Sequence, residues 1–302
     1  MKENLRDYAT VGLAHFMFWP DCVRDTRILI DTLPAFVKRS DIDMLDCCFP
    51  YGEQQRAKLI PLVRDCGKVV HVAVHLFPMD KISLGSTADN EKGLIRLAMR
   101  DQIEVAAAAG AQGVTFTSGL GCAAAERPAA KQAFADFCRW FCGELAKHQI
   151  TGLLEHFDTD FDRRFLYGST LDTVELIESL KPGIDNLRIQ LDVAHVRLLG
   201  ESFEHAIRTA APYLGHVHLG NCVMKDRADP FFGDRHPPIG YEGGEIGVAD
   251  IVEALKILLD VGYLGRERRG PLAVEARPPS GASADETIRQ QLELLEEAWR
   301  RV

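Results

Sequence analysis

The chain has 302 residues, of which 46% are hydrophobic and 26% are charged, a composition that excludes a disordered or fibrous protein. With 35 lysines and arginines against 44 aspartates and glutamates, the net charge of −9 disfavours a broad basic surface for nucleic acid or for an anionic membrane. No apolar run reaches the roughly 20 residues that cross a bilayer, and the N-terminal segment lacks the apolar stretch of a signal peptide. We therefore expect a cytoplasmic protein.

Short apolar runs of strand length alternate with longer amphipathic stretches along the whole chain. The predicted strands are 11–17, 43–48, 69–76, 113–117, 152–156, 187–191, 215–219 and 271–275. The predicted helices are 22–39, 53–66, 91–109, 129–148, 169–181, 202–212, 248–261 and 283–301. Eight βα units in about 300 residues predict a (β/α)8 TIM barrel formed by one domain, residues 1–302. A doubly wound open sheet is the alternative, but its GxGxxG turn is absent after the first strand.

The cysteines show no CxxC pair, and we expect small core residues rather than disulfides or a zinc site. They are Cys22, Cys47, Cys48, Cys66, Cys122, Cys138, Cys142 and Cys222.

A long segment from 221 to 247 interrupts the regular alternation. It reads NCVMKDRADPFFGDRHPPIGYEGGEIG, whereas βα loops usually have about two to six residues. It follows the seventh predicted strand and therefore lies on the face of a TIM barrel that carries the active site. We expect this loop to be functional.

Polar residues stand at the C-terminal ends of the last four predicted strands: Glu155, Asp192, His218 and Glu275. Three carboxylates in one barrel mouth would repel one another and lose hydration, so they either bind a cation or become partly protonated. Oxygen and imidazole ligands together suit Mn²⁺, Co²⁺, Mg²⁺ or Zn²⁺. Taken singly, each residue has another interpretation, because an acidic residue after a strand often caps the next helix and a lone histidine often satisfies a core hydrogen bond.

These four residues, with His195 three positions after Asp192 and with the segments HVHLGN and EARP, resemble the xylose-isomerase-like TIM-barrel superfamily. That superfamily contains sugar isomerases, epimerases and inosose dehydratases, with endonuclease IV as a distant branch. The resemblance covers essentially the whole chain. It implies one divalent cation, Mn²⁺ first, held by Glu155, Asp192, His218 and Glu275. It also implies that the two glutamates are catalytic and move the proton next to the carbonyl, and that His195 binds a substrate hydroxyl.

A cation that contacts the carbonyl and its neighbouring hydroxyl stabilises the enediolate left by proton removal. Two carboxylates acting as base and acid then give epimerisation or isomerisation. We therefore predict a metal-dependent sugar isomerase or epimerase, similar to ketose 3-epimerases. A lyase or dehydratase acting on an inosose or a 3-oxo-glycoside stays open, because it begins with the same enolate. A non-catalytic sugar-binding barrel is the least favoured alternative.

Two departures from the epimerase pattern are visible. Epimerases of this group usually place an arginine six residues after the histidine of strand seven, and here that position is Met224. The stretch GDRHPPIG at 233–240 instead resembles endonuclease IV, whose Asp and His in this stretch bind an additional zinc. Two observations disfavour an endonuclease: no histidine stands at the end of the fourth predicted strand, and the chain is acidic, which disfavours binding to DNA.

Further residues near the strand ends and in the long loop are candidates for substrate contact: His15, Trp19, His75, Arg235 and His236. For His236, a metal ligand and a solvated loop residue are the alternatives. We interpret His71 and His216 as structural. The expected partner is a small carbohydrate, with no nucleic acid and no membrane, and homo-oligomer formation is left open.

Overall fold

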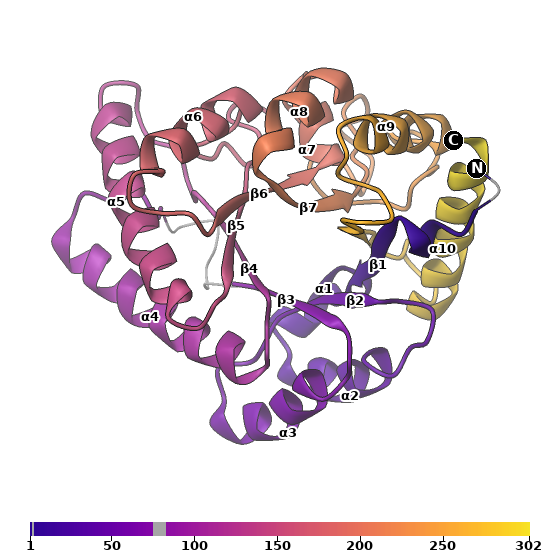
Figure 1. Cartoon of the computed structure of the whole chain (residues 1–302), viewed down its shortest axis with the longest axis horizontal. Coiled ribbons are helices and arrows are strands. Elements are labelled where there is room, and N and C mark those ends of the chain that lie inside the picture. Colours follow the sequence, from indigo (N-terminus) through magenta and orange to yellow (C-terminus); the bar gives the residue numbers. More distant parts are fainter. Residues whose placement is uncertain (2, 75–82) are drawn as a thin grey trace.

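The computed structural model of the chain describes residue 1, residues 3–74 and residues 83–302. Eight parallel strands close into a barrel in which each strand pairs with its neighbours along the chain and β8 pairs with β1. Figure 1 looks down the ring of strands and shows the helices arranged around its outside. The predicted (β/α)8 fold is confirmed.

The strands are β1 (Ala9–Ala14), β2 (Met44–Cys47), β3 (Val69–Ala73), β4 (Gly113–Thr117), β5 (Thr151–Glu155), β6 (Leu187–Asp192), β7 (Leu214–Leu219) and β8 (Gly270–Val274). The α-helices are α1 (His15–Phe18), α2 (Thr26–Phe36), α3 (Glu53–Arg64), α4 (Asp89–Ala108), α5 (Arg127–Ala146), α6 (Thr170–Leu180), α7 (Val193–Leu198), α8 (Phe203–Ala210), α9 (Val248–Asp260) and α10 (Ala284–Arg301). The 3₁₀ helices are η1 (Leu5–Asp7), η2 (Pro20–Val23) and η4 (Ala211–Tyr213).

The predicted boundaries fail mainly at the first βα unit. The strand predicted over 11–17 ends at Ala14, and the following residues form the short helix α1. An apolar run cannot by itself distinguish a strand from a buried helical turn. The helix predicted over 22–39 begins later, at Thr26, where Asp25 caps its N-terminus.

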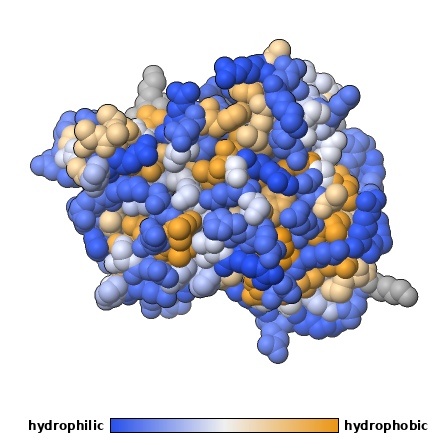
Figure 2. All heavy atoms as spheres, turned by 90° about the horizontal axis from the view of Figure 1, so that it is seen from above, coloured by the Kyte–Doolittle hydropathy of each residue, from blue (hydrophilic) through white to orange (hydrophobic). Residues whose placement is uncertain are grey.

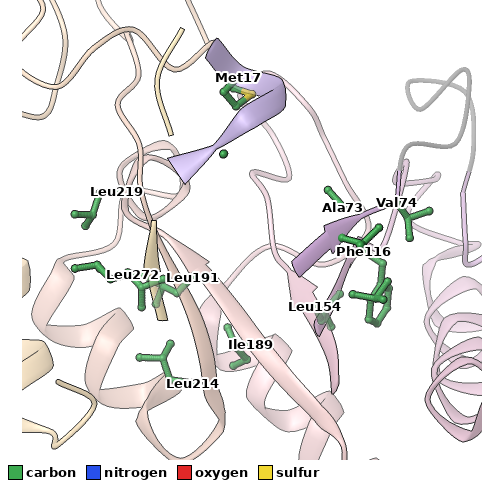
Figure 3. Packing of buried hydrophobic residues seen from close by; sticks show 14 of the residues in the cluster. Met17, Ala73, Val74, Phe116, Leu154, Ile189, Leu191, Leu214, Leu219 and Leu272 are labelled. Atoms are coloured by element: carbon green, nitrogen blue, oxygen red, sulfur yellow. The ribbon is translucent and has the colours of Figure 1, made fainter. Parts of the chain in front are cut away.

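The outer faces of the strands pack against the helices and form the core. Phe116 of β4 shows the pattern, because its ring centroid lies 4.9 Å from that of Phe141 on α5 and is surrounded by further aromatic rings of that helix. Figure 3 shows part of this core, with Leu154, Ile189 and Leu191 on the neighbouring strands β5 and β6. Buried on both faces, the strands read as apolar runs, which is why they could be predicted.

The interior of the barrel is polar and hydrogen-bonded. Thr115 of β4 donates to Gln190 of β6 at 2.6 Å. Asp46 of β2 accepts from the Nε2 atoms of His216 and His218 on β7, each at 2.9 Å. These bonds cross the barrel and satisfy groups that would be costly to bury alone. They connect the barrel floor to the rim where the candidate site lies.

The two chain ends lie side by side next to α10 (Figure 1). The N-terminal amine donates to the carbonyl of Trp299 at 2.8 Å, and the Trp299 indole donates to the carbonyl of Glu3 at 2.7 Å.

All the cysteines are free. Among the described residues, no helix is both long and apolar enough for a membrane span. Figure 2 shows a face of the barrel on which hydrophilic residues predominate.

Candidate metal centre

Four side chains from neighbouring strands converge at the C-terminal rim of the barrel. Glu155 and Asp192 are the last residues of β5 and β6, His218 is the penultimate residue of β7, and Glu275 directly follows β8. One ligand atom from each residue lies within 4.8 Å of those from the other three, and all four residues are buried. The structure thus brings together the four residues proposed as ligands from the sequence, because parallel strands end at one rim.

His218 is held from both sides of its ring. Its Nδ1 lies 2.6 Å from Glu275 Oε2, and its Nε2 lies 2.9 Å from Asp46 Oδ2. A carboxylate on one ring nitrogen fixes both the tautomer and the orientation of a metal-binding histidine. Asp46 therefore leaves Nδ1 facing the carboxylates as the ligand atom.

Asp192 uses its two oxygens differently. Oδ1 accepts from the backbone N–H of Ala194 at 2.6 Å and so caps α7. Oδ2 is buried and has no hydrogen-bond partner. Burial raises the pKa of Asp192 to about 7. The helix-cap and metal-ligand interpretations are therefore compatible, and the orphaned oxygen is a group that a cation would satisfy.

The two glutamates have opposite electrostatic surroundings. Burial raises the pKa of Glu155, and the negative charge of Glu275 adds to this effect. Burial also acts on Glu275, but the positive charges of His236 and His218 outweigh it and lower the pKa of Glu275. A divalent cation between these groups would remove the repulsion among the carboxylates. The residues therefore fit a divalent metal bound by oxygen and imidazole ligands.

A second group adjoins the first and comes partly from the long loop after β7. Asp234 Oδ1 lies 2.8 Å from His236 Nε2 and 3.1 Å from His195 Nε2. Asp234 Oδ2 accepts from Arg163 Nε at 2.7 Å. Asp192, His195 and His236 also form a set with ligand atoms within 4.8 Å of one another. The loop thus reaches the site.

The loop backbone is constrained where it meets the site. His236 has φ of 50°, in the left-handed region that non-glycine residues rarely adopt. At Gly220, which follows β7, a Cβ would lie 2.6 Å from His236 Nδ1 and 2.7 Å from Asp192 Oδ1. Only glycine leaves room for both side chains at that position.

Both ring nitrogens of His195 have partners within the protein. Its Nδ1 lies 3.1 Å from the carbonyl oxygen of His156, and its Nε2 lies 3.1 Å from Asp234. Burial opposes a charge on this ring, but the Asp234 carboxylate outweighs burial and raises the pKa of His195 to about 10. A direct bond to a substrate hydroxyl, as the family resemblance implies, would have to replace one of these contacts.

The site opens into a pocket of about 220 Å³ whose lining is both charged and apolar. Three of the candidate ligands, Glu155, His218 and Glu275, line it together with His195, Asp234, His236, Arg163 and Arg277. The apolar lining includes Phe16, Met17, Pro20, Val23, Val74, Phe116, Phe157 and Phe165. Figure 3 shows Met17 just after β1 and Val74 and Phe116 beside β3 and β4. A ligand in this pocket therefore meets both charged and hydrocarbon side chains.

The other predicted contact residues have different positions. His236 lines the pocket, but His15, Trp19 and Arg235 do not. His15 starts α1 because β1 ends one residue earlier, and its Nε2 lies 2.9 Å from Thr32 Oγ1 while its ring stacks on Trp19. Arg235 is exposed. The structure thus gives these three no contact with the pocket, and His75 lies outside the described residues.

Several pocket residues were not predicted. Asp46 lies inside the apolar run MLDC, where its acidic side chain was the available signal. Arg277 stands in the EARP segment, two residues after a proposed ligand, a spacing that places both on one side of an extended chain. Arg163 lies in a loop after β5 and carries no local signal. Asp234 appeared only through the endonuclease resemblance.

Comparison with known proteins gives the family. The family model described as xylose isomerase-like TIM barrel matches residues 35–298. The chain belongs to this family. It is 26% identical over 201 residues to the protein named "Putative hydroxypyruvate isomerase" from Mus musculus. That match covers 59% of this chain and 64% of the mouse protein, slightly less than two thirds of its length.

Two solved structures show the same fold. D-psicose 3-epimerase from Clostridium cellulolyticum H10, solved with D-tagatose, has a TM-score of 0.71 and 17% identity, covering 96% of this chain and 98% of that one. 3-Keto-D-glucoside 4-epimerase from E. coli has a TM-score of 0.69 and 12% identity, covering 97% of this chain and 99% of that one. At such identities the likeness concerns the fold.

Proposed function

We propose that the protein is a divalent-metal-dependent sugar isomerase or epimerase that moves a proton on the carbon next to a carbonyl. The observation that carries the proposal is the buried convergence of Glu155 and Glu275 with Asp192 and His218 within 4.8 Å. The names of similar proteins, a hydroxypyruvate isomerase and two epimerases, support the same reaction class.

Glu155, Asp192, His218 and Glu275 would hold the cation, with Mn²⁺ as our first choice and Co²⁺, Mg²⁺ or Zn²⁺ compatible with the same ligands. When bound, the cation would polarise the substrate carbonyl and stabilise the negative charge that develops on its oxygen. Asp46 holds the His218 ring in the orientation that this requires.

Glu155 and Glu275 are suited to be the acid and the base. They come from β5 and β8, so they reach the pocket from different parts of the rim. One carboxylate takes the proton from the carbon, and the other returns a proton. Return to the opposite face of the same carbon gives an epimer, and return to the neighbouring carbon gives an isomer. His195 and Arg163 position Asp234 beside this centre.

The test is exchange of solvent deuterium into ketoses by the Mn²⁺-loaded protein. We expect Glu275→Gln to fold and to reduce exchange by about 10³-fold, because a proton acceptor and a negative charge are both lost. Glu242→Gln changes an exposed glutamate in the long loop and is the matched control. Wild-type exchange by the Glu275→Gln variant would contradict the proposal.

Elemental analysis tests the metal directly. We expect about one divalent ion per chain in the purified protein and none in the double variant Asp192→Ala/His218→Ala. Product analysis then separates the alternatives, since a lyase releases water or an aglycone, whereas an endonuclease IV-like enzyme nicks DNA at abasic sites. Two or three zinc ions per chain would favour the endonuclease.

A further inference from the structure

Arg277 is a half-buried cation that lines the pocket, and among the described residues no acid pairs with its side chain. Its backbone N–H donates to the carbonyl of His236 at 2.7 Å, which fixes the chain after β8 to the long loop. Its side chain lines the pocket, and Nε is buried with no hydrogen-bond partner. In the part of the chain that the structure describes, the guanidinium forms no ion pair or hydrogen bond with any acidic residue.

The other arginine of the pocket shows the contrast. Arg163 donates through Nε to Asp234 Oδ2 at 2.7 Å and through Nη2 to the Asp234 carbonyl at 2.9 Å. Its charge is therefore balanced by the protein.

Neighbouring carboxylates do not explain Arg277. Glu275 and Asp234 line the same pocket, yet Glu275 pairs with His218, and Asp234 pairs with Arg163 and two histidines. A guanidinium whose buried Nε has no partner is stabilised by an acceptor that enters from the pocket. A bound ligand can supply such an acceptor.

We propose that the substrate carries a carboxylate and that Arg277 binds it. This inference rests on the proposed function and names its substrate class: a sugar acid or a short hydroxy-keto acid. The planar guanidinium matches a carboxylate in a bidentate geometry. One unpaired positive charge matches one negative charge, whereas a phosphate dianion would add a further negative charge beside Glu275 and Asp234.

The size of the pocket agrees with a small substrate. The Cα atoms of Glu275 and Arg277 lie at most about 7 Å apart, because two residues of extended chain span no more. The pocket volume of about 220 Å³ accommodates a molecule of several carbons. The reacting carbonyl and the carboxylate therefore belong to the same compact molecule.

The experiment compares neutral and acidic molecules of equal length on the Mn²⁺-loaded full chain. The three-carbon pair is dihydroxyacetone and hydroxypyruvate, and the six-carbon pair is D-fructose and D-fructuronate. Dihydroxyacetone phosphate and D-fructose 6-phosphate form the phosphate arm. Calorimetry measures binding, and solvent-deuterium incorporation measures proton transfer. We expect at least one carboxylate to bind tenfold or more tightly than its neutral counterpart.

The variant Arg277→Met should remove this preference by weakening the binding of the carboxylate at least tenfold more than the binding of the neutral compound, while Arg277→Lys should retain part of the preference. Arg235→Met removes an exposed arginine of the long loop and serves as the control. Circular dichroism and metal content establish that the variants are folded and loaded. An unchanged preference in Arg277→Met would overturn the inference.

The remaining outcomes separate the inference from the proposed function. Equal binding of neutral and acidic compounds, binding of no carboxylate, or tighter binding of the phosphates would overturn the carboxylate assignment. Deuterium exchange into neutral ketoses under those conditions would leave the proposed function standing. Arg277-dependent binding of a carboxylate without exchange into any compound would support the inference and contradict the proposed proton transfer.

Discussion

At the scale of single residues, Asp46 links the barrel floor to the candidate metal centre. Its Oδ2 accepts from His216 and His218, and His71 Nδ1 lies 3.5 Å from its Oδ1. Burial disfavours a charged carboxylate, but the neighbouring His216 outweighs burial and lowers the pKa of Asp46. Because several imidazole rings hold the Asp46 carboxylate in place, it can fix the orientation of the His218 ring.

Replacing Asp46 with Asn should therefore weaken metal binding about 10- to 100-fold, because the His218 ring loses the acceptor that fixes it. Titration of the metal-free protein with Mn²⁺ measures the dissociation constant. Asp43→Asn, which alters a partly exposed acid before β2 that pairs with Arg6, should leave it unchanged. Equal affinity in wild type and Asp46→Asn would show that His218 needs no such support.

His15 makes the stability of the fold sensitive to acid. Burial lowers its pKa to about 3, so the folded protein keeps the ring neutral where the unfolded chain, with a pKa of 6.5, binds a proton. Its contribution is complete above pH 6.5 and is lost as the pH falls toward 3, by about 1.4 kcal/mol per pH unit.

The variant His15→Gln should reduce the pH dependence of the free energy of unfolding by about that slope between pH 6.5 and 5. Urea unfolding at a series of pH values measures it. The exposed His205 on α8 offers the control variant His205→Gln, which we expect to retain the wild-type slope. A wild-type slope in His15→Gln would contradict the assignment of a neutral buried ring.

The four ligand candidates could be predicted because each interrupts an apolar strand at its end, where the barrel topology brings strand ends together. Arg277 and Arg163 could not be evaluated in this way, since their roles depend on whether an acid faces them across the pocket. His15 was expected at the end of the first strand, beside the pocket. The strand ends one residue earlier, at Ala14, so His15 instead begins a helical turn and contacts Thr32 of α2.

At the scale of elements, long amphipathic helices and apolar strands could be predicted, whereas α1 and α7 could not. Helix α7 has six residues and begins directly after β6, so its sequence has too few turns to show a helical period. Its N-cap is Asp192, which means that a proposed metal ligand also determines where the element starts. Ligand geometry and local secondary structure are therefore coupled on this side of the barrel.

Helix caps away from the site should affect stability alone. Ser169 caps α6 by accepting from the backbone N–H of Asp172 at 3.1 Å. Ser169→Ala should lower the free energy of unfolding by about 1 kcal/mol, because that N–H loses its acceptor. In the same helix, Ser179→Ala replaces an exposed serine of the last turn with a better helix former and should change stability by less than about 0.5 kcal/mol. Equal urea midpoints for the two variants would contradict the capping role.

At the scale of the whole molecule, the candidate ligands connect half of the barrel. They come from β5, β6, β7 and β8, and β8 in turn pairs with β1 to close the ring. A cation bound by four consecutive strands therefore opposes separation of those strands, and its binding free energy adds to the stability of the native state. Without a cation, the same carboxylates repel one another inside a buried site.

Metal removal should consequently destabilise the entire fold. At a free Mn²⁺ concentration of 100 times its dissociation constant, the loaded protein should be about 2.7 kcal/mol more stable than the chelated protein, which corresponds to a thermal midpoint about 5 °C higher. Asp192→Ala/His218→Ala should not respond to Mn²⁺. Compared with the chelated protein, the Mn²⁺-loaded protein should show the largest increase in hydrogen-exchange protection in β5–β8, because these strands carry the ligands. Increased protection confined to the loop after β7 would place the cation at Asp234 and His236 instead.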